Sequence, residues 1–532
     1  MRRSLLALLL SLGVCLVLSA SAFSTGPGGW NHVGGAAPGL NGHVTAMHRF
    51  GTELYLGGSF TNAGGIAAAD RIVKWDGVNW HALGTTPIGN NGSVYAIAHY
   101  GGKIFAGVTF VNAGGQAAAD YLAVFDGVSW KPFCNSTPNP AFNQAGLQVR
   151  ALQVVGSRLY VGGTFQNANG DKRADYLIAC DIATGAPSPT VDTDGDFTGA
   201  VYALAATSDG TLYAGGTFTN LDRLTTADGV AAYTPDGGWQ GLGATPIGGI
   251  VRGLHANGSD LYISSDGLDI GGIAQADHLV KWDGSAYTAL GGNTAGTNGW
   301  FPSTTYINAM TSSGPLLFAA GSWQNANGQP TADVVAYFDG SNWRALGSNG
   351  HGNGPWVGDT QALAVVNGQL YAGGALTGAG GDKKANFAAS RSLRLPDAEI
   401  GIFSGNYVGN DIYSKTAVGQ TKTMQIARGN SQYFPVLIQN DGPLPASFKV
   451  KGTGAATGYT VTYINYANGA NITTAVRNGT FSTDTLARGQ SFAMKMVVKL
   501  SATAANTGSF VVAASSTAGT QPDVVKGIVR AT

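Results

Sequence analysis

The residues whose spacing best suits metal chemistry form a short acidic run before the middle of the chain. Asp192, Asp194 and Asp196 occupy alternate positions around Gly195. Hard cations such as Ca²⁺ take several carboxylate and carbonyl oxygens as ligands, and alternate aspartates around a turn can supply them. The glutamate that completes the common calcium loop is missing, because Ala203 stands at that position. Calcium is therefore the one cofactor that the sequence suggests, and a solvated acidic turn is the alternative.

Most other aspartates recur at regular intervals along the first four hundred residues. One set comprises Asp70, Asp120, Asp175, Asp228, Asp277 and Asp333, with Asn386 in the seventh copy, and a second comprises Asp76, Asp126, Asp181, Asp283 and Asp339. A residue that serves every copy of a repeat alike is better explained by bracing a loop or turn than by catalysis. The recurrent Asn62, Asn112, Asn167, Asn220 and Asn325 fit loop positions that need a left-handed backbone.

Motifs of nucleophilic and metal catalysis are missing from the sequence. It contains no Gly-x-Ser-x-Gly elbow, no His-Glu-x-x-His and no Cys-x-x-Cys, and its eight histidines are scattered. No catalytic residue is predicted. A glycosidase needs two carboxylates that face one site, and the sequence leaves that alternative open because aspartates are frequent in its loops.

The elements that position these residues are repeats. An apolar-aromatic pair followed by a glycine pair and Asn-Ala-Gly-Gly, or a variant of it, begins near Leu54, Ile104, Leu159, Leu212, Leu261, Leu317 and Leu370. A short alternating run precedes each copy, and an Asp-Gly turn and a Trp-x-x-Leu-Gly phrase follow most of them. Each unit of about 53 residues therefore holds four strand-like runs, which is typical of a propeller blade. Seven copies predict a seven-bladed β-propeller over residues 28–395.

Closure of the ring explains an isolated phrase near the start of the chain. Trp30 to Gly34 resembles a fourth strand and stands before the first copy, whereas the seventh copy lacks its own Trp-x-x-Leu-Gly. We expect this N-terminal strand to complete blade seven, since an unpaired strand edge invites aggregation. A linear solenoid would have no use for it.

The pattern changes after Pro396. Residues 398–532 contain about seven apolar runs between polar turns, which favours an immunoglobulin-like β-sandwich and an all-β chain.

The units Leu-Tyr-x-Gly-Gly-x-Phe-x-Asn-Ala-Gly-Gly and Trp-Asp-Gly-x-x-Trp-x-x-Leu-Gly resemble kelch-like propeller repeats. They look most similar to secreted bacterial and fungal repeats of the Rax2-like cortical polarity proteins. The resemblance spans residues 28–395 and implies a binding or surface scaffold. Kelch-type copper radical oxidases need a Cys-Tyr crosslink with His ligands, and neither Cys134 nor Cys180 lies in such a motif.

The N-terminal segment and the composition predict an exported protein. Arg2 and Arg3 precede an apolar run that ends near Leu18, and Ala20-Ser21-Ala22 is a cleavage site, so residues 1–22 are predicted to be a secretory signal peptide rather than an uncleaved anchor. We expect no membrane insertion after cleavage and an extracellular or periplasmic location. Lys and Arg number 30, as do Asp and Glu, which removes the electrostatic case for nucleic acid.

The two cysteines outside the signal peptide are predicted to be unbonded. Cys134 is expected after the fourth strand of blade two, and Cys180 at the end of the third strand of blade three. Those ends would lie on opposite faces of the disc, about 17 to 20 Å apart. A disulfide needs Cα atoms within about 7 Å.

Ligand binding is predicted on the face that carries the long loops, which join the second to the third strands and one blade to the next. Trp300 and Phe301 lie in the loop that enters blade six, and His351 and Trp356 in the loop that enters blade seven. These side chains could form an aromatic platform for a polysaccharide, cell-surface or protein ligand. The alternative is that the rings pack as plugs between blades or against the sandwich domain.

The sequence favours a secreted, non-enzymatic binding or cell-surface scaffold protein. The alternative function is a carbohydrate-active enzyme, a hydrolase or lyase, with its site in the propeller funnel.

Overall fold

The computed structural model describes residues 29–34, 39–89, 91–134, 142, 147–171, 174–188, 197–349, 352–403, 405–516 and 522–532. The predicted signal peptide and the aspartates at 192, 194 and 196 lie outside these ranges, as does His351. No helix among the described residues is both long and apolar enough to cross a membrane.

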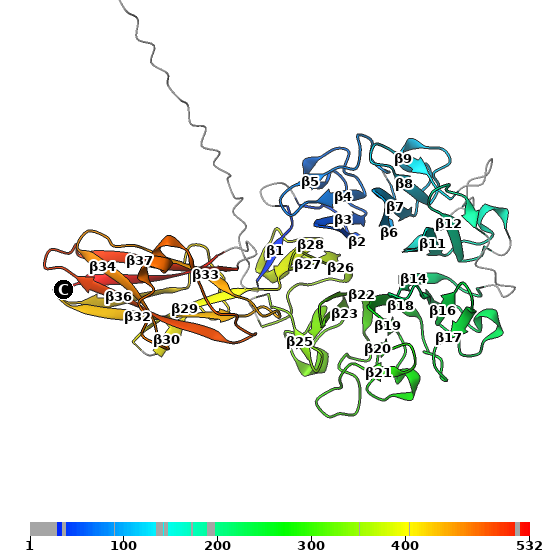
Figure 1. Ribbon diagram of the computed structural model, residues 1–532. Helices are drawn as coiled ribbons and strands as arrows, with labels where there is room; N and C mark the ends of the chain where they lie inside the picture. The colour runs from blue at the N-terminus through cyan, green and yellow to red at the C-terminus, as the bar shows by residue number, and fades with distance from the viewer. Residues whose placement is uncertain are drawn as a thin grey trace, which may run out of the picture.

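Seven four-stranded antiparallel sheets form a ring, as the repeats predict (Figure 1). Blades one to three consist of β2 (Val44–Phe50), β3 (Glu53–Gly58), β4 (Ile72–Trp75) and β5 (Trp80–His81); β6 (Val94–Tyr100), β7 (Lys103–Val108), β8 (Leu122–Phe125) and β9 (Trp130–Pro132); and β10 (Val149–Val155), β11 (Arg158–Gly163), β12 (Leu177–Asp181) and β13 (Pro187–Ser188). Blades four and five consist of β14 (Val201–Ala206), β15 (Leu212–Gly216), β16 (Val230–Thr234) and β17 (Gly238–Gly241); and β18 (Val251–Asn257), β19 (Asp260–Ser265), β20 (Leu279–Trp282) and β21 (Tyr287–Ala289). Blade six consists of β22 (Tyr306–Ser313), β23 (Leu316–Ser322), β24 (Val335–Phe338) and β25 (Trp343–Ala345).

Blade seven is closed by the N-terminal strand, which confirms the prediction. β26 (Thr360–Val366), β27 (Gln369–Gly374) and β28 (Ala388–Ser392) come from the end of the propeller, and β1 (Trp30–His32) pairs with β28. The Trp30 indole donates to the Leu346 carbonyl at 3.0 Å, as the Trp343 indole donates to Leu290 one blade earlier. The tryptophan of the fourth strand thus ties these blades to their neighbours.

The paired glycines of the repeat allow two close approaches: the first glycine faces the neighbouring blade, and the second faces the start of the innermost strand of its own blade. A Cβ on Gly57 would lie 2.6 Å from the Val94 side chain of the next blade, and one on Gly58 would collide with the His43 carbonyl. Real Cβ atoms do not reach such distances, so both positions need glycine.

The recurrent polar residues serve their own loops, as predicted. In all seven blades the carboxylate or amide oxygen of the first set accepts the backbone N–H eight residues earlier, at 2.5 to 3.0 Å, as Asp70 does from Asn62. The aspartates of the second set cap the turn between the third and fourth strands by accepting hydrogen bonds from backbone N–H groups of that turn. Asp76, for example, accepts from Val78 and Asn79. The recurrent asparagines have φ between 48° and 57°, the predicted left-handed conformation.

The C-terminal residues form a β-sandwich with more strands than the sequence predicts. One sheet has the order β30 (Gly405–Val408), β29 (Pro396–Ile402), β32 (Ser431–Asn440), β36 (Ser491–Leu500) and β34 (Tyr459–Asn465). The other has the order β31 (Thr421–Ile426), β38 (Asp523–Ala531), β37 (Thr507–Ser516), β33 (Phe448–Gly452) and β35 (Phe481–Ser482), and helix α1 (Thr473–Asn478) lies between β34 and β35 in the chain. Phe434, Phe448 and Phe510 are fully buried in the core between the sheets.

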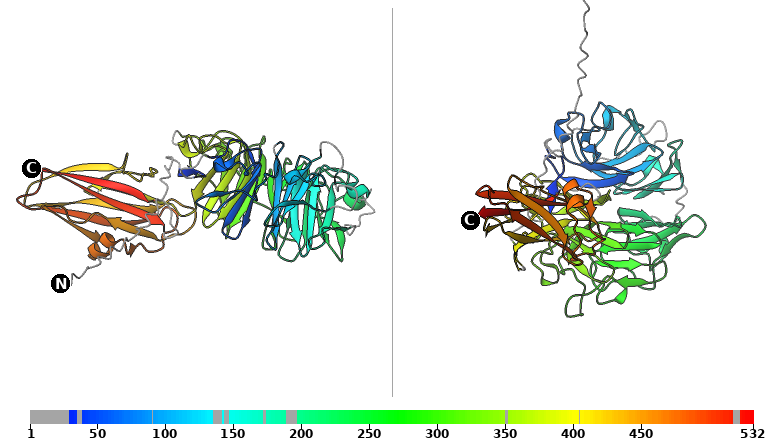
Figure 2. Two further views of the ribbon diagram at one scale, coloured as in Figure 1. Left: turned by 90° about the horizontal axis from the view of Figure 1, so that it is seen from above. Right: turned by 60° about the vertical axis from the view of Figure 1, so that its left-hand side comes forward.

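The sandwich lies beside the disc and covers neither of its two faces (Figures 1 and 2). Backbone hydrogen bonds join the domains near the end of the propeller. The Leu444 N–H donates to the Leu393 carbonyl at 3.0 Å, and the Asp441 N–H donates to the Leu395 carbonyl at 2.9 Å. The long-loop face around the ring axis therefore stays accessible.

Candidate functional site

A cavity of about 680 Å³ occupies the centre of the propeller and is lined by the first halves of the seven innermost strands. Each of these strands has a register shift between its first and third repeat positions, as β2 has between Val44 and Ala46. A β-bulge leaves one residue unpaired and redirects its side chain. The repeated bulge thus turns the second residue of every innermost strand toward the channel.

Three rings of equivalent residues line this cavity. The second repeat position contributes Thr45, Tyr95, Arg150, Tyr202, Arg252, Asn308 and Gln361, all half-buried. The third contributes Ala46, Ala96, Ala151, Ala203, Gly253, Ala309 and Ala362, and the fourth contributes Met47, Ile97, Leu152, Leu204, Leu254, Met310 and Leu363. The innermost strands start on the long-loop face, so a polar mouth opens on that face above an apolar floor. We refer to the seven residues of the second position as the polar ring.

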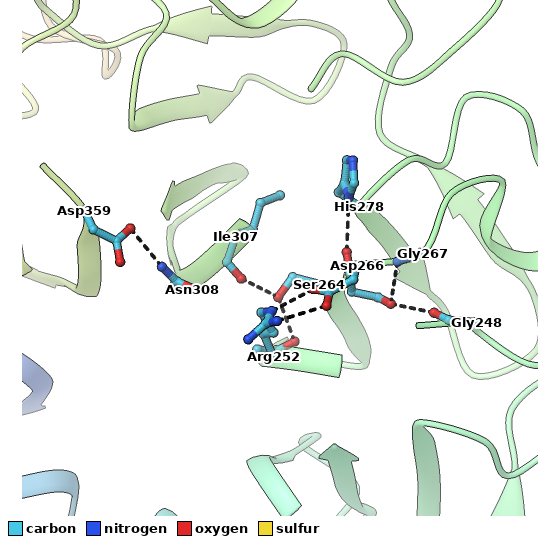
Figure 3. Close-up of polar contacts among 11 residues, drawn as sticks. Gly248, Arg252, Ser264, Asp266, Gly267, His278, Ile307, Asn308 and Asp359 are labelled. Carbon is cyan, nitrogen blue, oxygen red and sulfur yellow. Dashed lines mark hydrogen bonds and ion pairs between the residues drawn. The ribbon is translucent and has the colours of Figure 1, made fainter. Parts of the chain in front are cut away.

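Hydrogen bonds between blades hold several members of the polar ring and their neighbours (Figure 3). The Thr45 hydroxyl donates to the Val94 carbonyl at 2.5 Å, and the Asn308 amide donates to the Asp359 carboxylate at 3.1 Å. Burial raises the pKa of Asp359 above its ordinary value. Ser264 on β19 donates to the Ile307 carbonyl at 2.9 Å. These contacts hold the mouth in one arrangement before any ligand arrives.

The two arginines of the ring have different surroundings. Arg252 forms a two-pronged ion pair with Asp266, at 2.6 and 3.0 Å, and its guanidinium lies 4.6 Å from the Tyr306 ring centre. The Arg150 guanidinium lies 4.5 Å from the Tyr95 ring centre and 5.7 Å from that of Tyr202. Cation–π contacts of this kind orient a guanidinium without neutralising it.

The aromatic platform predicted on the long-loop face is wrong, because its described rings are buried. Trp300, Phe301 and Trp356 are 4%, 6% and 4% exposed. Trp300 stacks on Trp343 with ring centres 5.7 Å apart, and Trp356 meets Trp30 edge-on at 4.7 Å.

The rings are plugs between blades, as the alternative interpretation holds. Other loops that enter blades bury apolar residues as well, namely Leu40, Ile88, Phe142, Phe197 and Ile247. That recurrence in the sequence could have identified the tryptophans as core residues, because a large apolar side chain in each such loop has a blade surface to cover.

The prediction of unbonded cysteines is also wrong. Cys134 and Cys180 form a disulfide, with Cα atoms 5.5 Å apart. The prediction assumed long strands at opposite faces, but β9 spans three residues and β12 five. Cys134 follows β9 with a left-handed φ of 63° and packs with Cys180 in the core shared by blades two and three. Face-to-face packing of neighbouring blades brings the two sulfurs together.

The proposed calcium run at Asp192, Asp194 and Asp196 lies outside the described residues, and the residues that are described contain no cluster of three or more His, Cys, Asp or Glu suited to a metal. The polar ring is the site that sequence reasoning missed. Its signal was available: among the first four positions of the innermost strands, the second is the one that changes between polar types from copy to copy.

Comparison with known proteins adds no assignment. No family model matches the chain, and no curated protein matches it. Among solved structures, the N-terminal domain of PorA is 12% identical with a TM-score of 0.17, covering 25% of this chain and 97% of that one. Domains 4 and 5 of the S-layer protein SbsC are 16% identical with a TM-score of 0.14, covering 32% and 70%. The VesB protease of Vibrio cholerae is 12% identical with a TM-score of 0.16, covering 41% and 62%. Scores this low carry no argument about function, so the chain is characterised by its own architecture: a seven-bladed β-propeller closed by its N-terminal strand and followed by a β-sandwich.

Proposed function

We propose that the protein is a secreted, non-enzymatic binding or scaffold protein that receives its ligand at the polar ring. The observation that carries this proposal is the contrast between repeated and varied positions. The third and fourth positions of the innermost strands are small and aliphatic in nearly every blade, whereas the second position holds five different polar or aromatic residue types. Packing demands are alike in every blade, so they do not account for this variety.

The cavity has the size and lining of a ligand site. Its volume of about 680 Å³ lies within the range of roughly 300 to 1,000 Å³ usual for small-molecule sites. Polar groups at the mouth and apolar groups at the floor suit a ligand that is held by hydrogen bonds and stacking. A polysaccharide chain end fits this description, as do a cell-surface glycan and a polar segment of a protein.

The alternative of a hydrolase or lyase receives less support. Hydrolysis with two carboxylates requires a pair about 5 to 10 Å apart around the bond that is broken. Among the described residues that line the cavity, Asp359 is the one carboxylate, and the recurrent aspartates are engaged by their own loops. This composition favours binding over cleavage.

The Cys134–Cys180 disulfide supports the proposal that the protein is exported from the cytoplasm. Disulfides persist in oxidising compartments such as the extracellular space and the periplasm. The Cys134–Cys180 bond therefore agrees with the signal peptide predicted for residues 1–22. We also propose, from the repeat phrases, that the blades are of the kelch-like type.

An array of glycans and cell-wall polymers, probed with the mature protein, tests the proposal. We expect at least one polymer to bind, and we expect Tyr95→Ala and Tyr202→Ala to weaken that binding at least tenfold. Tyr100→Ala is the matched control, because Tyr100 lies at the other end of β6 and is 43% exposed. Binding that is equally sensitive to the control, or release of cleaved products from the bound polymer, would overturn the proposal.

A further inference from the structure

The polar ring holds one arginine whose charge the described residues leave unpaired. Arg150 donates from Nε to the neutral Gln148 side chain at 2.6 Å. Its other contacts are the two tyrosine rings, and no ion pair between Arg150 and a carboxylate occurs in the part of the chain that the structure describes. Its terminal amino groups remain as charged donors at the wall of the cavity.

Arg252 provides an internal comparison at the same ring position. Asp266 neutralises it with two parallel hydrogen bonds, the geometry that a guanidinium forms with a carboxylate. Arg150 has the same side chain, the same bulged position and a similar tyrosine contact, but lacks the carboxylate. The group missing at Arg150 is the group that Asp266 supplies to Arg252.

The opposite side of the mouth is built to accept hydroxyl groups. Asp359 precedes blade seven, which lies across the ring from blade three and Arg150. Its carboxylate, together with the amides of Asn308 and Gln361, presents hydrogen-bond acceptors and donors to the cavity. A carboxylate at this place disfavours ligands with many negative charges, such as oligophosphates, through like-charge repulsion.

We propose that the channel mouth binds a carboxylated sugar, namely a uronic acid residue of an acidic polysaccharide. The sugar's carboxylate pairs with the two terminal amino groups of Arg150, its ring packs beside Tyr95 and Tyr202, and its hydroxyls donate to side-chain oxygens of Asp359 and Asn308. This inference rests on the proposed binding function and specifies its ligand class.

Calorimetric titration of the mature protein with two probes tests the inference. The probes are the β-1,4-linked trimer of glucuronic acid and the trimer of galacturonic acid. Their fully methyl-esterified forms are the matched ligands, because esterification removes the charge and keeps the sugar. We expect at least one acid trimer to bind roughly tenfold to a hundredfold more tightly than its ester, the range of a charge-assisted paired contact. We expect Arg150→Gln to abolish that preference.

Two variants separate a ligand contact from a folding defect. Arg150→Lys keeps the charge without the planar fork, so it should restore part of the preference for the acid. Arg344→Gln should leave that preference intact, because Arg344 lies on the outer strand β25, away from the polar ring, and its charge is matched by Asp339. An unchanged melting temperature in Arg150→Gln confirms that the blades remain folded.

The outcomes distinguish this inference from the proposed function. Equal affinity for acid and ester, a preference that survives Arg150→Gln, or no binding of either acid trimer would overturn the uronic acid assignment. The proposed function would still stand if a neutral polymer bound and Tyr95→Ala weakened it. If no polymer depends on the polar ring, both fail.

Discussion

Removal of the Cys134–Cys180 disulfide should lower the melting temperature of the propeller by about 5 °C. The bond links positions 46 residues apart. On the chain-entropy account, closing a loop of that length in the unfolded state contributes about 4 kcal/mol at 25 °C. The propeller runs from Trp30 to Ser392. An unfolding entropy of about 2.1 cal/mol/K per residue, about 0.8 kcal/mol/K for such a domain, converts this loss into a shift of about 5 °C.

Differential scanning calorimetry of the mature protein and the variant Cys134→Ala/Cys180→Ala measures this shift. Alanine is the suitable replacement because both cysteines are fully buried in an apolar cluster. A reducing agent should lower the melting temperature of the wild type and leave that of the variant unchanged. Two free thiols in the denatured, unreduced wild type would show that the bond is absent. A shift below about 1 °C with the bond present would refute the loop-entropy reasoning.

Three further perturbations probe the sandwich, the blade contacts and the ring closure. Burial raises the pKa of Asp397 to about 9, above its unfolded value of about 3.9, so the sandwich should lose stability as the pH rises from about 4 through 9. Asp397→Asn should flatten this dependence in thermal melts at pH 5, 7 and 9. Equal slopes of melting temperature against pH in the wild type and the variant would contradict the reasoning. Gly162→Ala should destabilise the propeller by about 1 to 3 kcal/mol in urea unfolding, because the new Cβ would lie 2.6 Å from the Val201 side chain. Gly39→Ala is the control and should have little effect, because the atom nearest to its new Cβ is 3.8 Å away. Similar losses of stability in the two variants would argue against close contact between blades. Trp30→Ala removes a fully buried ring that ties β1 into blade seven and should cost about 3 to 5 kcal/mol in the same assay, so a loss under about 1 kcal/mol would mean that β1 does not close the ring.

The architecture could be predicted because its signals are local and repeated. The glycine pair, the Asp-Gly turn and the left-handed asparagine each reflect the backbone conformation of a few neighbouring residues, and their recurrence in most of the seven copies makes the repeat unmistakable. Blade number follows from counting these copies. The role of Trp30 follows from the strand that blade seven lacks, and the pairing of β1 with β28 confirms it.

The burial of the loop tryptophans could not be predicted from the sequence with the same certainty as the architecture. A single tryptophan in a long polar loop has the same local sequence signature whether it faces solvent or covers a blade, and only the recurrence of an apolar residue in the other entering loops indicates burial. Trp300 packs on Trp343 and Trp356 on Trp30, residues 43 and 326 positions away in the chain. The choice between the two states depends on the shape of a surface that distant residues build.

The sequence alone therefore determined the repeating unit, the number of blades and the way in which the ring closes, because these depend on contacts within a blade or on its missing part. The tertiary structure decided which residues of different blades meet: Cys134 with Cys180, and Arg150 with Tyr95 and Tyr202. Those contacts between blades depend on blade twist, on strand length and on a bulge that turns one side chain per blade toward the ring axis. Such features change distances across the ring by several ångströms while leaving the local pattern of residues almost unchanged.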